Sequence, residues 1–324
     1  MSVVLWKYFF ECVIWGRGTS SGVFQDTIFM IDYNPKNWLS LITHAYSKQV
    51  MRTLTPSLVA LGLFSALVCY LMVTVFELHE AEFQPTTAMH SLLGIVLGLF
   101  LVFRTNSAYD RWWEGRKLWG GLVNSTRNFA LKVGASIHDP EERRWFSMMI
   151  PNFVIAVKES LRKGVHMQEL EFASDADFKE VEVSKHKSNI ISSLMYRRVN
   201  DLYVKGKITG DQLINLDKEQ KDFIDLMGAC ERIKNTPIPY SYSMYIKKFI
   251  FIYIATLPFA FVTVSGYMTV PIVIVIAYVI LSVELIAEEI EEPFGRDIND
   301  LPTDDLCTKI RDNVREILGV RDNS

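Results

Sequence analysis

Long, uninterrupted apolar runs dominate the hydropathy pattern of this chain. Leu58–Phe76 contains no Asp, Glu, Lys, Arg or His. At about 1.5 Å of rise per residue, a helix of that length approaches the thickness of the hydrocarbon core of a bilayer, about 30 Å. Thr86–Phe103 is shorter and richer in glycine, with His90 near its start. The pattern predicts one membrane-spanning helix in each run.

A third apolar run, Phe249–Val283, contains no acid or base. One helix of this length would be too long for a single crossing. We therefore expect a break at Ser265–Thr269, where glycine interrupts the run and Pro271 begins the next helix. The chain then has four spans in total.

The charges that flank the spans predict their orientation. Cations precede the first span and follow the second, whereas the connection between them carries only acids. Because cytoplasmic loops are enriched in Lys and Arg, both termini and the long central segment are expected in the cytoplasm, with the chain in the plasma or inner membrane. The cations are Lys36, Lys48 and Arg52, then Arg104, Arg111, Arg116 and Lys117, and the acids are Glu77, Glu80 and Glu82.

The polar remainder has helical periodicity and no convincing strand pattern. Amphipathic helices are expected around Pro151, across Leu213–Met227 and from an N-cap at Thr303 onward. The predicted fold is an all-α membrane protein with four transmembrane helices and a large cytosolic helical region. Its expected parts are an N-terminal cytosolic segment, a first hairpin, the cytosolic helices, a second hairpin and a C-terminal helix with an acidic segment, at residues 1–54, 55–104, 105–248, 249–287 and 288–324.

Composition fits this picture and excludes several classes of protein. The chain has 324 residues, 49% of them hydrophobic and 22% charged, with a net charge of -3. This balance argues against a disordered chain and against a nucleic-acid binder. The cysteines lack the spacing of a disulfide framework or zinc site, and no catalytic constellation is present, so neither a cofactor nor an enzymatic activity is expected. These cysteines are Cys12, Cys69, Cys230 and Cys307.

The second span carries two patterns on adjacent faces. Gly94 and Gly98 form a GxxxG pair that lets another helix approach closely. Ile95, Leu99 and Phe103 recur at every fourth residue and form an apolar stripe. One interpretation is a face that meets lipid or a neighbouring helix. The other is the lining of a narrow hydrophobic pore, with the glycines against the next subunit.

Three runs of sequence resemble the bestrophins, in their bacterial-type branch. The first is SLLGIVLGLFLVFRTNSAYDRWWEGRKLWG, at Ser91–Gly120. The others are GACERIKNTPIPYSY at Gly228–Tyr242 and AEEIEEPFGRDINDLP at Ala287–Pro302. The resemblance extends in order from about Thr53 onward, whereas the preceding residues are less diagnostic.

This resemblance implies a homopentameric channel for small monovalent ions in a lipid bilayer, with no nucleic-acid partner. By position, Ile95, Leu99 and Phe103 would form its hydrophobic neck. A second, cytosolic constriction would fall at Asp211, with Leu213 and Ile214 as alternatives.

The ion that crosses is left open by the residues. Ring edges at Phe103 would favour anions, and Arg104 and Asn106 would flank the neck as donors. Arg104 could equally pair with an acid, and a ring of Asp211 would favour cations. Chloride is the expectation, and a sodium channel of the same fold is the alternative. A secondary transporter is disfavoured because the span cores lack charged residues, although a receptor or scaffold remains possible.

An acidic cluster follows the fourth span. Animal relatives carry a calcium site in the corresponding region, but Asp297–Asp300 lacks the glycine of an EF-hand loop and Pro302 follows it. We therefore expect no metal here, and expect the carboxylates to pair with Arg or Lys of neighbouring helices or to face water. The cluster comprises Glu284, Glu288, Glu289, Glu291, Glu292, Asp297 and Asp300.

Overall fold

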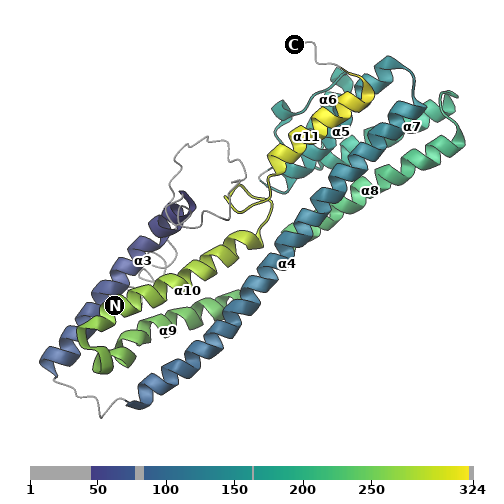
Figure 1. Cartoon of the computed structure of the whole chain (residues 1–324). Coiled ribbons are helices and arrows are strands. Elements are labelled where there is room, and N and C mark those ends of the chain that lie inside the picture. Colours follow the sequence, from purple (N-terminus) through teal and green to yellow (C-terminus); the bar gives the residue numbers. More distant parts are fainter. Residues whose placement is uncertain (1–44, 77–83, 163, 321–324) are drawn as a thin grey trace. The chain divides into compact units, whose positions relative to one another are not determined.

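The computed structural model describes residues 45–76, 84–162 and 164–320, and the regular structure of these residues is entirely helical (Figure 1). The elements are α3 (Ala45–Cys69), η3 (Tyr70–Val75), α4 (Gln84–Ser136), α5 (Pro140–Ser160), η5 (Met167–Glu169), α6 (Asp175–Val183), α7 (Lys187–Val204), α8 (Gly210–Asn235), α9 (Tyr240–Ser265), η6 (Gly266–Met268), α10 (Thr269–Glu291) and α11 (Thr303–Leu318).

Three helical stretches of the described chain are long and apolar enough to cross a membrane. They are Val50–Val75, Ala88–Ser136 and Tyr240–Glu291. The third is interrupted by the 3-10 turn η6, where Gly266 has φ of +53°. Glycine tolerates this backbone conformation because it has no Cβ. The predicted break is thus confirmed, and α9 and α10 form the second pair of membrane helices.

Two spans differ in extent from the sequence expectation. The first helix begins at Ala45 and ends in a π-helical turn, Tyr70–Val75. The second helix does not stop with the apolar run at Phe103 but continues for 53 residues in all, to Ser136. Hydropathy identifies where a helix leaves lipid, whereas only a helix-breaking residue or a cap would end the helix itself.

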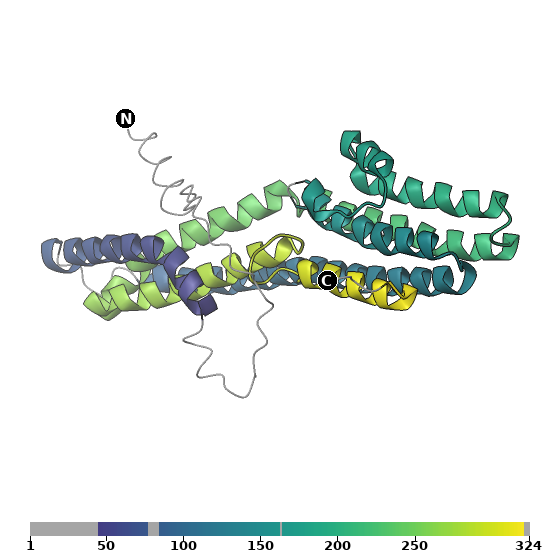
Figure 2. The ribbon, with the colours of Figure 1, turned by 90° about the horizontal axis from the view of Figure 1, so that it is seen from above.

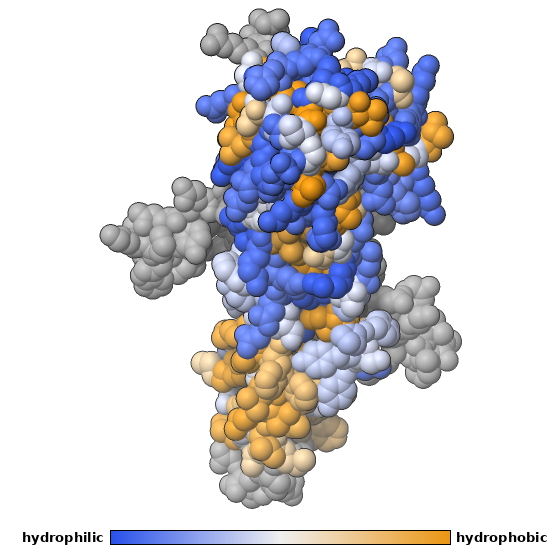
Figure 3. Space-filling model, turned by 90° about the vertical axis from the view of Figure 1, so that its right-hand side faces the viewer, coloured by the Kyte–Doolittle hydropathy of each residue, from blue (hydrophilic) through white to orange (hydrophobic). Residues whose placement is uncertain are grey.

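The described residues fold into two compact units. The first comprises the described residues up to Tyr109 together with Ile238–Glu291, and the second comprises Asp110–Pro237 together with the described residues from Glu292 onward. Figure 3 shows apolar residues gathered on the first unit and mostly polar residues on the surface of the second. This division matches a membrane part and an aqueous part.

In the first unit, α3 lies beside α10, and α9 pairs with α10 through η6 (Figures 1 and 2). The buried core draws on all four membrane helices, since α4 contributes Leu97 and Leu101. The other core residues are Val50, Leu54, Leu58, Ile246, Ile250, Ile254 and Ala277.

The second unit is a helical assembly around α5. This helix is buried along most of its length and begins at an N-cap, Asp139, whose side chain accepts a hydrogen bond from the Glu141 amide. It confirms the helix expected around Pro151. Phe129, Phe153 and Phe223 meet in the core, with ring centroids 5.4–5.5 Å from Phe223.

The start of α11 corrects one sequence expectation. Thr303 is the first helical residue rather than the N-cap, which is Pro302. The Thr303 hydroxyl does not cap the helix because it is buried and accepts a hydrogen bond from Arg162, at 2.9 Å. The apolar stripe of α11 is present, with Ile310 and Val314 buried.

A candidate neck helix and its supporting contacts

The three residues predicted for the neck lie together on the outer surface of α4. Ile95, Leu99 and Phe103 are 66%, 57% and 61% exposed within the protomer. Leu92 and Val102 are exposed beside them. A helix in water would bury such side chains, so this face must meet lipid, another subunit or a sparingly hydrated pore.

The opposite face of α4 attaches it to the rest of the first unit. Leu97 and Leu101 are buried there, and the Phe100 ring meets Tyr245 and Phe249 edge-on or nearly so. Nearer the start of the helix, the His90 Nε2 lies 2.9 Å from the Thr256 hydroxyl. These contacts fix which face of α4 is left outward.

The two glycines of the GxxxG pair have different surroundings. A Cβ on Gly94 would lie 2.7 Å from the hydroxyl of Tyr253 on α9, so this glycine permits the close approach of a helix of the same protomer. A Cβ on Gly98 would have no neighbouring atom within 4 Å in the protomer. The close contact that GxxxG predicts is therefore present at Gly94, whereas Gly98 lies on an open surface.

Arg104 is buried inside the protomer, only 1% exposed. Its Nη2 lies 2.7 Å from Oε2 of Glu291, and its Nε lies 3.6 Å from Oε1 of Glu284, both on α10. Of the two roles left open by the sequence, the structure therefore shows the pairing with acids. Asn106 is exposed on the outer side of α4.

The acidic cluster after the fourth span is largely engaged with other helices. Glu291 also accepts a hydrogen bond from the Ile238 amide, two residues before α9 begins, at 3.1 Å. Glu288 pairs with Lys247 at 3.1 Å, and Glu292 with Lys234 at 3.3 Å. The expectation that these carboxylates pair with neighbouring cations is confirmed for these residues and for Glu284.

The candidates for a cytosolic constriction lie in the first turns of α8. A capping box between Thr209 and Gln212 begins this helix. Asp211 is exposed in its first turn, Leu213 is partly buried against the core of the second unit, and Ile214 is 69% exposed. Ile214 is thus the one apolar side chain of the three that points mainly outward.

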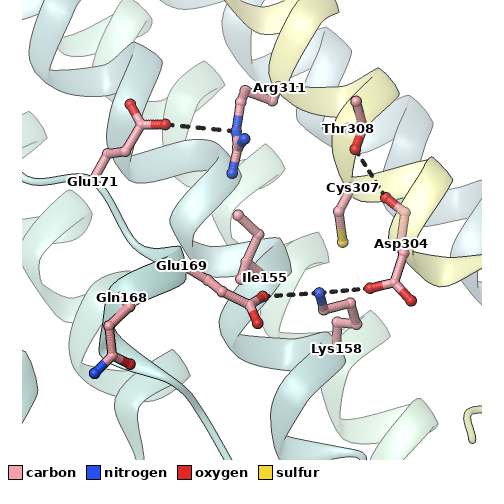
Figure 4. Close-up of a pocket in the computed structure, with 9 residues that line it drawn as sticks. All are labelled: Ile155, Lys158, Gln168, Glu169, Glu171, Asp304, Cys307, Thr308 and Arg311. Atoms are coloured by element: carbon pink, nitrogen blue, oxygen red, sulfur yellow. Dashed lines mark hydrogen bonds and ion pairs between the residues drawn. The ribbon is translucent and has the colours of Figure 1, made fainter. Parts of the chain in front are cut away.

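A pocket of about 370 Å³ in the second unit lies between α5, the η5 segment and α11 (Figure 4). Its Lys158 amino group contacts three carboxylates, those of Glu159, Glu169 and Asp304, at 2.8–3.0 Å. Arg162 makes two further hydrogen bonds to Asp304. Burial alone would raise the pKa of Asp304, but the hydrogen bonds from Arg162 and Lys158 lower it to about 2.

This ion cluster around Lys158 was not predicted from the sequence. Its signal was present, because Lys158 and Glu159 directly follow the apolar run Phe153–Val157 at the end of α5, and the structure buries both. A buried charge is rarely found without a partner. Tyr253 was likewise not predicted as the partner of Gly94, since spacing within one helix carries no information about the residues of the helix opposite.

The structure shows how deeply the cysteines are buried and whether residues that could bind a metal lie together. Cys69, Cys230 and Cys307 are buried and unbridged, and burial raises the pKa of the Cys230 and Cys307 thiols to about 12. Cys12 lies outside the described residues. Among the described residues no three His, Cys, Asp or Glu side chains are grouped to hold a metal.

Comparison with known proteins shows which family this chain is similar to. A family model described as bacterial/fungal bestrophin protein matches residues 30–316. A voltage-dependent anion channel-forming protein of Nostoc is 31% identical over 89% of this chain and 94% of its own length. The voltage-dependent anion channel-forming protein YneE of Escherichia coli K12 is 30% identical over 87% of this chain and 91% of its own length.

Solved structures agree with the sequence relatives. A crystal structure of a bacterial bestrophin homologue from Klebsiella pneumoniae superposes with a TM-score of 0.75 at 28% identity. The match covers 82% of this chain and 98% of the Klebsiella chain. The similarity thus extends over both the membrane helices and the polar helices.

Proposed function

Since this chain belongs to the bacterial and fungal bestrophin family, we propose that it forms a membrane channel for small monovalent anions, with chloride as the first candidate. The observation that carries the proposal is the outward apolar stripe of Ile95, Leu99 and Phe103 on a membrane helix whose other face is packed into the protomer. The names of the Nostoc and Escherichia coli relatives supply the anion.

In this proposal several copies of α4 surround one axis and turn the stripe inward. Five copies are expected from the bestrophin resemblance. The neck that they enclose has apolar walls, so it holds a continuous water column for only part of the time and controls ion flow by its hydration. The termini are cytoplasmic, as the flanking cations predict.

Exposure alone does not assign the stripe to a pore, so the assignment also depends on the family membership. On α3, Val59, Leu63 and Leu67 recur at the same spacing and are 56%, 69% and 55% exposed. Exposure alone therefore identifies a face that meets lipid or a second subunit. The run Ser91–Gly120, which resembles the bestrophins most specifically, includes Ile95, Leu99 and Phe103, whereas none of the three resembling runs includes the α3 stripe.

Selectivity in this channel would come from the neck rather than from Arg104. Because Arg104 is buried and paired with carboxylates, its positive charge is largely neutralised before it could act on an ion in the pore. The ring edges of Phe103 carry the positive part of the aromatic quadrupole and would favour anions slightly. The expected preference is therefore modest.

For a cytosolic constriction we propose Ile214 rather than Asp211 or Leu213. Ile214 is apolar and exposed, whereas Leu213 contributes to the core of the second unit. A carboxylate ring at Asp211 would oppose the anion preference.

Reversal potentials measured with purified protein in planar bilayers test the proposed function. In asymmetric NaCl the potential should shift toward the equilibrium potential of chloride. A shift toward that of sodium would replace the anion channel with the cation channel of the same fold. Ion-coupled uphill transport without discrete current steps would instead support a transporter.

A further inference from the structure

Resting on the proposed channel function, we propose that Arg104, clamped by Glu284 and Glu291, is a positioning residue that holds the cytosolic end of the neck. In this arrangement Arg104 does not touch the permeating ion. It acts through Phe103, its neighbour in the chain, which occupies the outward face of the same helical turn.

The first argument is the position of the clamp. α4 is attached to the first unit through His90 near its start, through apolar and aromatic contacts in its middle, and through Arg104 just after the stripe. The clamp joins α4 to α10, whereas the His90 hydrogen bond and the Phe100 ring contacts join it to α9. The last turn of the neck is therefore held by an ion pair.

The second argument is the burial of the charges. Arg104 and Glu284 are both buried, and Glu291 also accepts a hydrogen bond from the Ile238 amide just before α9. Removing one member of a buried ion pair leaves the other charge in a poorly solvated place, which is strongly unfavourable. A movement of the helix that brings the remaining charge toward water relieves that cost, and it carries Phe103 along.

The third argument is that the clamp is under-satisfied. Nε and Nη1 of Arg104 and both carboxylate oxygens of Glu284 are buried and make no hydrogen bond in the described structure. Glu284 and Glu291 both pair with the single guanidinium group of Arg104. A fully bonded network would lock the helix, whereas this arrangement holds it with little reserve. Loss of one partner should therefore change how often the neck hydrates.

Arg104→Gln and Glu291→Gln distinguish a clamp from a direct ion contact. If Arg104 contacted anions, Arg104→Gln would lower the chloride-to-sodium permeability ratio, while Glu291→Gln would free the guanidinium and raise it. For a clamp, both variants loosen the same turn. We expect both to raise the open probability in bilayers, each by about tenfold, with the same sign of any change in permeability ratio.

The double variant Arg104→Gln/Glu291→Gln completes a thermodynamic cycle. If the two residues act as one unit, the double variant should resemble either single variant rather than multiply their effects. Arg104→Lys keeps the charge but reaches one acid at a time, so it should give an intermediate open probability. It also supplies a measurable channel if the glutamine variants do not assemble.

Lys248→Gln is the matched control, because it removes an exposed cation from α9 of the same unit. It should leave open probability and permeability ratio unchanged. Opposite signs for the two single variants, independent effects in the double variant, or wild-type behaviour of all variants would overturn the clamp while leaving the channel intact. Absence of current in the wild-type protein would instead overturn the proposed function.

Discussion

At the scale of single residues, the second unit depends on a few buried charges that compensate one another. Lys158 is the central one, since its amino group contacts three carboxylates and one of them, Glu159, is almost completely buried. Such a cluster contributes less to stability than its number of contacts suggests, because desolvation opposes each contact. Breaking it is nevertheless costly, since a charge is then left buried without its partner.

Lys158→Ala is therefore expected to destabilise the protein by about 3–5 kcal/mol, because it leaves Glu159 without its closest cation. Lys221→Ala is the control, since Lys221 and Asp225 form an exposed pair within α8. An exposed pair of this kind contributes little to stability, because water screens its charges. Denaturant unfolding in detergent, followed by circular dichroism, measures both. Equal effects of the two substitutions would contradict the assignment.

Asp304 should contribute to the loss of folded-state stability at acid pH. Its pKa is lowered from 3.8 to about 2, so its interactions stabilise the folded state fully above pH 3.8 and lose that effect as the pH falls toward 2. Asp304→Asn should lower the unfolding temperature at neutral pH, and the difference from wild type should shrink between pH 4 and pH 2.

Thermal unfolding across this pH range checks the expectation, with Asp305→Asn as the neighbouring control. Asp305 follows Asp304 in the first turn of α11, so both variants lose one charge near the same helix N-terminus. A difference that stayed constant down to pH 2 would show that Asp304 acts through something other than its charge.

At the scale of elements, two glycines four residues apart on α4 illustrate how one motif splits into two roles. Gly94→Val should push α4 away from Tyr253 and lower stability by about 1–3 kcal/mol. Gly98→Val should leave the protomer unaffected, because no atom of the protomer lies within 4 Å of the added Cβ. Thermal unfolding of the two variants, together with their oligomer mass, provides the comparison.

Measuring the mass of the oligomer distinguishes the roles of the two glycines. If α4 meets a neighbouring subunit at Gly98, Gly98→Val should weaken assembly without lowering protomer stability. Destabilisation of the protomer by Gly98→Val alone would contradict the described packing.

The helices themselves were predictable to different degrees. The break near Gly266 could be located because a long apolar run and a glycine are local signals. The continuation of α4 to Ser136 could not, since hydropathy changes at Phe103 while helix propensity does not. The first residue of α11 was displaced by one because Arg162, far away in sequence, binds the Thr303 hydroxyl.

At the scale of the whole molecule, the sequence located the outward apolar stripe of α4 but not the contacts that hold this helix. Ile95, Leu99 and Phe103 follow from a period of four residues, and their outward orientation agrees with that pattern. The partners of Arg104 lie on α10, and the sequence offered only a choice between an acid and an ion. Contacts between distant helices depend on how the helices pack, which periodicity does not encode.

The neck itself is tested by replacing Ile95, Leu99 and Phe103 together with alanine. Smaller side chains leave room for a permanent water column, so the leak current should rise by an order of magnitude or more. The control is the corresponding triple alanine variant of Val59, Leu63 and Leu67, which have the same spacing and similar exposure. Single-channel recording of correctly assembled protein should show wild-type current for the α3 variant. Equal currents from the two variants would refute the neck assignment.

The hydrocarbon character of the stripe on α4 has a consequence for regulation. Ile95, Leu99 and Phe103 carry no atom that exchanges a proton with water in the range where proteins stay folded. A barrier built from them senses neither acidity nor alkalinity on its own. Any response of this channel to acid would have to arise from ionisable side chains that lie off this stripe.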